Sequence, residues 1–455
     1  MRRLLLLLAC LLAPSSGAAQ EYNLPGFGEG NAVSLNQEYY LGRAWLMSFR
    51  RQAPILSDAL IQDYTETLIY RLAVSSQLRE RRLEVVVVDN PTINAFAVPG
   101  GVVGVHTGLI AKAQNEAQFA SVLTHELAHL SQRHFSRGLE AQKRSTAAMM
   151  AGLLGGLVAI AAGAGEAGMG AIMGGQAAAM DSQLSNSRQH EQEADRVGMQ
   201  NQVNAGLDPG GAAGMFEVMQ AESRYYGRPP EFLLTHPLTE KRIADAKNRA
   251  GSYPKRIYQD NPEFQLMRAR VQVGFIKDDE EAVARFRENR AKGGRQAVPA
   301  QYGLILALTR AGQFGEAREL LKPMREFSPQ NIVYTVAEAE IDITEQKYES
   351  AIALLENSLA NTPGNHPLTM SLASAYEKSG YYAKADRLLS RHVRDHYSNA
   401  AIWYQLAEVQ GQAGNILGVH QSRAEYFALN GAMQQDIELL NQALPLATNQ
   451  ITVER

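Results

Sequence analysis

The first part of the chain alternates between helical and extended patterns. Residues 36–80 are rich in Tyr, Leu, Arg and Gln, and they predict helices. The valine run at residues 84–88 predicts a buried strand that ends at Asp89-Asn90-Pro91. Residues 94–105 predict two short strands around a Pro-Gly-Gly turn. These strands would either present an edge to an extended peptide or only pack against the next helix.

The next element is a buried helix. Small and apolar residues recur at three- and four-residue steps from Ala117 to Leu130, and the helix is expected to begin near Asn115-Glu116. Further on, residues 146–165 contain no charged residue, and this length reaches that of a membrane span. The stretch is dominated by Ala and Gly, however, so residues 146–180 are expected to pack on the domain. The alternative is peripheral contact with lipid or unfolded substrate.

From Pro254 onward, similar residues recur along the chain with a period of 34 residues. A glycine or glutamine occupies the presumed turn, and an alanine follows five residues later, where paired helices would touch. This spacing is typical of tetratricopeptide repeats, whose concave face binds proteins. An earlier, degenerate unit is expected over about residues 265–298. The repeated positions are Gly312, Gln346, Gly380 and Gly414, and Ala317, Ala351 and Ala385.

The chain thus predicts a mainly α (α+β) fold. We expect a first domain of helices with a small β-sheet, followed by an α-helical repeat solenoid. The N-terminus has the basic start, apolar run and small residues of an export signal, with cleavage expected after Ala19. The expected divisions are residues 1–19 for the signal peptide, 20–260 for the first domain and 261–455 for the repeat domain.

The composition excludes several kinds of chemistry and of binding partner. Cys10 is the single cysteine and lies in the signal, so the mature chain would lack thiols, disulfides and Cys-ligated zinc. The formal net charge of −3 gives no support for nucleic-acid binding. An exported, cysteine-free protein of mixed charge fits the periplasm.

The candidate chemistry centres on the HExxH sequence His125-Glu126-Leu127-Ala128-His129. Four residues turn a helix by about 400°, so both histidines share one face and could bind one Zn²⁺. Glu126 would act as general base toward a water whose pKa the metal lowers to about 7. The alternative is a helix whose histidines are merely exposed or hydrogen-bonded.

A second acidic segment could complete the site. Glu191 and Asp195 are four residues apart and share a helical face. Glu191 fits the third zinc ligand, and Asp195 fits a carboxylate that orients a ligand histidine. Glu193 is the second choice of ligand. His134, expected about 140° around the same helix from His129, should not join this metal.

Taken together, these motifs resemble the BepA-like family of zinc metallopeptidases in the HtpX and CAAX-protease superfamily. The resemblance rests on the export signal, the residue 94–101 strands, the HExxH sequence, Ser187-Arg188 through Asp195, Thr235-His236-Pro237 and the repeats. It implies a gluzincin-like zinc-peptidase domain over residues 20–260. It also implies one Zn²⁺ per chain on His125, His129 and Glu191, with Glu126 as base and Asp195 in support. It also implies that His236 lies at the active site, where it either stabilises the oxyanion or occupies the fourth zinc position and inhibits the enzyme.

The function expected from this resemblance is assembly and quality control of outer-membrane β-barrel proteins in the periplasm. Unfolded or misassembled outer-membrane proteins would be substrates, and the repeats would dock on the β-barrel assembly machinery. The alternative from another class is a repeat-based chaperone or adaptor with secondary or latent proteolysis. A membrane-embedded protease anchored by residues 146–165 is a third hypothesis.

Overall fold

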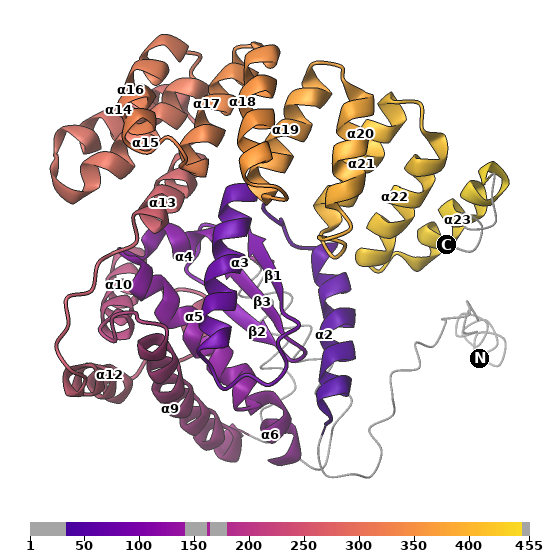
Figure 1. Ribbon diagram of the computed structural model, residues 1–455. Helices are drawn as coiled ribbons and strands as arrows, with labels where there is room; N and C mark the ends of the chain where they lie inside the picture. Colours follow the sequence, from indigo (N-terminus) through magenta and orange to yellow (C-terminus); the bar gives the residue numbers. More distant parts are fainter. Residues whose placement is uncertain (1–32, 142–161, 164–179, 448–455) are drawn as a thin grey trace, which may run out of the picture.

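The computed structural model describes residues 33–141, 162–163 and 180–447. The expected signal peptide lies outside the described residues, and so does the 146–180 segment except for Ala162, Gly163 and Met180. Figure 1 shows a lower part with a small sheet surrounded by helices, and an arch of paired helices above it. The predicted mainly α architecture with a small sheet and a helical-repeat array is therefore confirmed.

The sheet has three strands in the order β1-β3-β2. β1 (Glu84–Val88) runs parallel to β3 (Val102–His106), and β2 (Ala95–Val98) pairs with β3 in antiparallel register. Gly100 and Gly101 connect β2 to β3 with φ angles of 87° and 84°, which favour glycine. A Cβ at Gly100 would lie 2.3 Å from the carbonyl oxygen of Glu38. This turn therefore packs closely on the helix that carries Glu38.

Helices surround the sheet on several sides (Figure 1). Ser34 begins the first described helix with a capping box, in which its side chain and that of Gln37 each bond the other's backbone N–H. The helices of this part are α2 (Leu35–Arg50), α3 (Ala59–Val74), α4 (Thr107–Lys112), α5 (Glu116–Ser131), α6 (His134–Ala141), α9 (Met180–Asn204), α10 (Gly211–Tyr226), α11 (Phe232–Thr235) and α12 (Glu240–Ser252).

Helix α5 is the buried centre of this part. Its first turn is capped by Asn115, whose side chain accepts a hydrogen bond from the backbone of Gln118. Phe119, Leu123 and Leu127 are fully buried, and each such side chain contributes about 1.5–3 kcal/mol by leaving water. The helix packs against β2, α9 and α10. Its side chains can therefore meet residues from several different elements.

The end of α5 differs from the prediction. We expected one helix to continue to His134, but α5 stops at Ser131 and α6 begins at His134. Arg133 between them has φ 53°, a left-handed conformation that ends a helix. The angular argument used for His134 therefore does not apply, although His134 does lie outside the group of donor atoms as predicted.

The arch consists of antiparallel helix pairs. The repeated turn positions Gly312, Gln346, Gly380 and Gly414 all have positive φ, between 65° and 82°. At each of these residues the chain turns back from one helix to the next, and this conformation favours glycine. The turn residue therefore recurs every 34 residues. The helices are α13 (Pro262–Phe275), α14 (Asp279–Ala291), α15 (Ala297–Arg310), α16 (Phe314–Phe327), α17 (Ile332–Thr344), α18 (Tyr348–Asn361), α19 (His366–Lys378), α20 (Tyr382–His392), α21 (Ala400–Gln412), α22 (Ile416–Leu429) and α23 (Met433–Ala443), with short 3₁₀ turns at Gly294–Gln296 and Leu444–Leu446.

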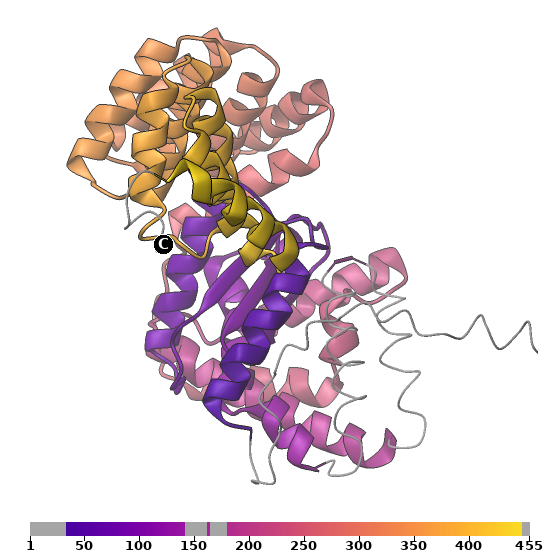
Figure 2. The same cartoon turned by 90° about the vertical axis from the view of Figure 1, so that its right-hand side faces the viewer.

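The repeat array folds back on the lower part, a point that the sequence left open. Its first helix, α13, packs on α3 and α4, and Phe264 stacks on Phe119 with ring centroids 5.7 Å apart. The far end returns as well, because the turn at Gly431 contacts Met47 of α2. Figure 2 shows the array lying across one end of the sheet-containing part. In the described part of the chain, no helix is long and apolar enough to cross a membrane.

Candidate metal centre

Helix α5 places the two histidines of the HExxH sequence side by side. The Nε2 atoms of His125 and His129 lie 3.0 Å apart, as one helical turn on one face predicts. His125 and Glu126 are buried, whereas His129 is partly exposed near the end of the helix. The surrounding core therefore restrains His125 and Glu126, and His129 keeps some exposure to solvent.

Helix α9 brings Glu191 to the same point from 62 residues further along the chain. Its Oε2 lies 3.4 Å from His125 Nε2, and its Oε1 lies 3.4 Å from His129 Nε2. The close approach of α9 to α5 depends on Gly198, because a Cβ there would lie 3.0 Å from the backbone nitrogen of His125. The small residue thus positions the carboxylate.

His236 completes the group from the segment after α11. Its Nδ1 lies 3.3 Å from His125 Nε2 and 3.0 Å from Glu191 Oε1. Its Nε2 lies 3.3 Å from Glu126 Oε1. The ring stacks on Phe232, with centroids 4.6 Å apart, and the His236 backbone N–H donates to the Phe232 carbonyl. These contacts fix the imidazole over the other three side chains.

The donor set fits a divalent metal ion. One donor atom from each of His125, His129, Glu191 and His236 lies within 4.8 Å of the others. A tetrahedral zinc with bonds of about 2.0–2.1 Å separates its donors by about 3.3 Å, close to the measured separations. Glu126 Oε1 and Glu191 Oε2 are buried and make no hydrogen bond of good geometry among the described residues. His236 Nε2 and Arg242 Nη1 approach these two oxygens as ion-pair partners. A metal ion among the donors would add further positive charge beside the carboxylates.

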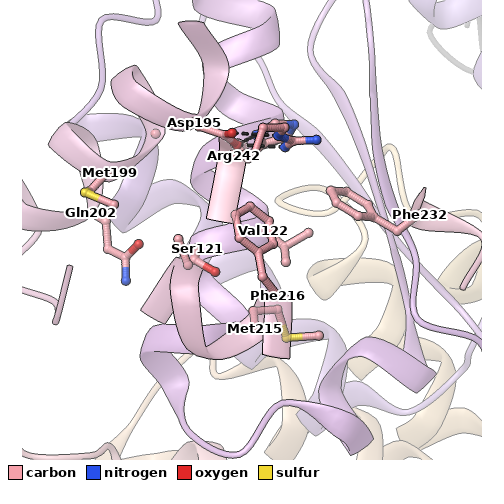
Figure 3. A pocket seen from close by; sticks show the side chains of 12 residues that line it. Ser121, Val122, Asp195, Met199, Gln202, Met215, Phe216, Phe232 and Arg242 are labelled. Atoms are coloured by element: carbon pink, nitrogen blue, oxygen red, sulfur yellow. Dashed lines mark hydrogen bonds and ion pairs between the residues drawn. The ribbon is translucent and has the colours of Figure 1, made fainter. Parts of the chain in front are cut away.

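Asp195 and Arg242 support the centre from behind. Asp195 Oδ1 lies 3.0 Å from His125 Nδ1, the ring nitrogen that faces away from the donor group. Arg242 donates to both oxygens of Asp195, at 2.7 and 2.8 Å, and Figure 3 shows this pair beside Phe216 and Val122. Its Nη1 also lies 3.0 Å from Glu191 Oε2. Charge-assisted contacts of this kind orient a ligand imidazole and hold its tautomer.

Sequence reasoning did not identify Arg242 as a residue of the site. The one indication in the sequence of such a residue was the charge of the site. Glu126, Glu191 and Asp195 place three carboxylates in one region. Burial of so much negative charge requires a cation besides the metal. The sequence offered no means of choosing among the basic residues.

His134 and Glu193 lie beside the centre and outside the donor group. His134 Nδ1 is 2.9 Å from His129 Nδ1, and His134 Nε2 is 3.1 Å from Glu193 Oε2. Arg137 donates to the same Glu193 oxygen at 2.8 Å. Glu193, the second choice of ligand, therefore faces His134 and Arg137. His134 supports His129 much as Asp195 supports His125, a role that the sequence did not indicate.

The pKa values of the four central side chains, His125, Glu126, His129 and Glu191, are shifted in different directions. Burial raises the pKa of Glu126. Burial also opposes charge on Glu191, but the nearby histidines outweigh it and hold its pKa well below the usual range. Burial lowers the pKa of His129 to about 3. For His125 burial acts in the same direction, but hydrogen bonds to Asp195 and Glu191 prevail and raise its pKa to about 9.

An HExxH helix joined by a distal glutamate on a second helix defines a metallopeptidase. Comparison with known proteins agrees, because residues 59–250 match Peptidase family M48 and residues 342–409 match Tetratricopeptide repeat. The chain is 34% identical over 419 residues to the Beta-barrel assembly-enhancing protease of Escherichia coli (strain K12), covering 92% of this chain and 86% of that protein. The protein of the same name from Yersinia pestis is 32% identical over 438 residues, covering 94% and 90%.

A more distant relative matches less than half of the chain. The Mitochondrial metalloendopeptidase OMA1 of Schizosaccharomyces pombe is 30% identical over 230 residues, covering 47% of this chain and 61% of that protein. The chain belongs to peptidase family M48. It is a member that combines the peptidase domain with tetratricopeptide repeats, as the BepA-like resemblance implied.

Proposed function

We propose that this M48 peptidase is a zinc-dependent endopeptidase with one zinc per chain, bound by His125, His129 and Glu191. The observation that carries the proposal is the convergence of their donor atoms within 4.8 Å, with Glu126 beside them. Two imidazoles and a carboxylate form the usual ligand set of a catalytic zinc peptidase. When bound, the zinc ion supplies Lewis-acid polarisation and makes water a nucleophile near neutral pH.

Glu126 is the general base in this proposal. It accepts a proton from the attacking water and returns it to the leaving amine as the peptide bond breaks. Its carboxylate is buried beside β2, where a hydrogen bond from the backbone of Ala97 reaches it. β2 pairs only with β3 among the described strands, so its other edge is suited to an extended peptide substrate. Asp195 positions His125 by accepting from its Nδ1–H.

His236 holds the resting enzyme inactive in this proposal. Its Nδ1 points at His125 and Glu191, where a fourth zinc ligand would sit, and its Nε2 faces the base Glu126. An imidazole in this position competes with both water and substrate. The same histidine could stabilise the oxyanion after it moves, but its present contacts favour the inhibitory role.

The biological setting follows from the relatives. Proteins named Beta-barrel assembly-enhancing protease match over most of this chain. We propose that this protein acts in the periplasm, with residues 1–19 as a cleaved signal, 20–260 as the peptidase domain and 261–455 as the repeat domain. Its substrates would be unfolded or misassembled outer-membrane β-barrel proteins. The repeats would dock on the β-barrel assembly machinery.

The repeat array favours a second, chaperone-like function. Helices α13–α23 contribute no residue to the metal centre, yet they make up a large share of the described chain. An adaptor role predicts that a Glu126→Gln variant still restores outer-membrane protein assembly in a deletion strain. Removal of residues 265–455 should abolish that rescue.

The proposed activity is tested with Glu126→Gln. This variant should keep its fold and bind metal as the wild type does, but it should lose cleavage of an unfolded outer-membrane protein by about 10²-fold or more. Glu217→Gln is the matched control, because the Glu217 side chain is more than half exposed and pairs with Lys247. Undiminished proteolysis by Glu126→Gln, with normal metal content, would falsify the assignment of the base.

A further inference from the structure

Three histidines of the repeat array form a second cluster away from the peptidase centre. His366 begins α19, His392 ends α20, and His396 lies in the turn that follows. His366 Nδ1 is 2.8 Å from His392 Nε2, and one ring nitrogen from each of the three lies within 4.8 Å of the others. His366 and His392 are buried, and His396 is partly buried.

The cluster lies at the junction between the array and the peptidase part. Helix α19 packs on α3 of the peptidase part, as the arrangement in Figure 1 shows. Two residues after His396, the carbonyl of Ser398 accepts a hydrogen bond of 2.8 Å from Arg50 of α2. The histidines are therefore held between elements that are more than 290 residues apart in the sequence.

Two carboxylates lie near His396. Burial lowers the pKa of His396, and Asp395 and Asp63 of α3 act in the opposite direction, so both lie within electrostatic range of this ring. Asp395 is exposed, whereas Asp63 is partly buried. A cation among the histidines would be attracted by the partly buried carboxylate of Asp63.

The three rings can each offer one nitrogen to a single metal ion. Their centroids lie 5.2 Å apart for His366 and His392, 5.0 Å for His366 and His396, and 4.3 Å for His392 and His396. The contact between His366 Nδ1 and His392 Nε2 involves one nitrogen of each of these two rings. Neutral imidazole is a common metal ligand through either ring nitrogen.

We propose that His366, His392 and His396 bind a divalent transition-metal ion at this junction. Imidazole ligands suit zinc, copper and nickel, and three of them leave one position for water or a carboxylate. Asp63 offsets the charge of the ion from the side of the peptidase part. The ion ties the ends of α19 and α20 to the turn that contacts α2, and so it stabilises the junction.

Metal counting tests this site on the full-length mature protein. After chelation, dialysis and titration with Zn²⁺ alone, the wild type should bind about two equivalents. His366→Asn/His392→Asn/His396→Asn should bind about one, and so should the variant His129→Ala/Glu191→Gln, which lacks the peptidase centre. His420→Asn, on another repeat helix, should still bind two. A single equivalent in the wild type, or a second equivalent that survives the triple substitution, would overturn the proposal.

A spectroscopic experiment separates metal loss from misfolding. Co²⁺ added to His129→Ala/Glu191→Gln should give visible d–d absorption from imidazole ligands alone. His396→Asn in that background changes only the partly buried histidine and should weaken Co²⁺ binding at least about 10-fold, with unchanged circular dichroism. Cobalt absorption of undiminished strength and affinity in this variant contradicts the site. Failure of the peptidase proposal would instead appear as two equivalents of metal retained by His129→Ala/Glu191→Gln, or as unchanged proteolysis in Glu126→Gln.

Discussion

Arg242 donates hydrogen bonds to both carboxylate oxygens of Asp195, from Nε at 2.7 Å and from Nη2 at 2.8 Å. The same guanidinium lies 3.0 Å from Glu191 Oε2 and donates to the carbonyl of Pro237 at 2.8 Å. One buried cation thus contacts the carboxylate behind His125, the distal glutamate, and the segment that carries His236. Three parts of the centre depend on it.

Arg242→Met is therefore expected to weaken the metal site. The substitution leaves Asp195 buried without its cation, and loss of such a supporting contact costs about 10–100-fold in metal affinity. Breaking a buried ion pair should also lower the free energy of unfolding by about 3–5 kcal/mol. Competition with a zinc chelator and urea denaturation measure the two effects.

The matched control is Arg249→Met on the same helix. Arg249 is partly exposed and pairs with Asp245 one turn away, so its loss should change the free energy of unfolding by less than about 1 kcal/mol. Equal metal affinity in Arg242→Met and wild type would show that Asp195 orients His125 without help from Arg242.

His236→Ala should raise proteolysis of an unfolded outer-membrane protein. Removing the imidazole frees the position that faces His125 and Glu191 and uncovers Glu126 for substrate. Initial rates at equal metal content provide the measurement. The control is His420→Ala in the repeat array, which should behave as the wild type. A lower rate in His236→Ala would favour the oxyanion role instead.

Much of the centre was predictable because its signals are local. Helical periodicity alone places His125 beside His129 and Glu191 on the face of Asp195. The structure brings these side chains together from α5 and α9. The meeting of the two helices is not a local property, and it depends on close packing at Gly198 that no periodic pattern reveals.

The rest could not be predicted for related reasons. Arg242 lies 47 residues after Asp195, and nothing in the sequence distinguishes it from the adjacent Lys241. His134 was misplaced because the left-handed turn at Arg133, a residue that rarely adopts it, ends the helix early. The 34-residue period predicted the repeats well, but it carries no information on how the array contacts α2 and α3.

Gln346→Gly should stabilise the protein. Gln346 has φ 65° at a turn where the neighbouring repeats have glycine, and its exposed side chain makes no hydrogen bond in the described structure. Glycine removes the strain of a left-handed side-chain residue, for a net gain of about 0.5–1 kcal/mol in the free energy of unfolding. Urea denaturation measures this gain in the free energy of unfolding. Gln313→Gly is the control, because Gln313 is exposed at φ −89° and should lose stability instead.

Arg270→Met should loosen the contact between the repeat array and the peptidase part. Arg270 on α13 donates from Nε to Asp58, the N-cap of α3, at 2.5 Å, and from Nη1 to Glu340 of α17 at 3.0 Å. It is largely buried, so its loss leaves two carboxylates facing each other without a cation, and the free energy of unfolding should fall by about 3 kcal/mol. Hydrogen exchange should rise at the start of α3 and along α17.

Arg287→Met provides the comparison for this junction. Arg287 pairs with Glu316 within the array, and both side chains are about half exposed, so the expected loss is below about 1 kcal/mol. If both variants lose the same small amount and exchange at α3 stays slow, Arg270 is dispensable for holding the array. Apolar contacts such as Phe264 on Phe119 would then be sufficient to join the two parts.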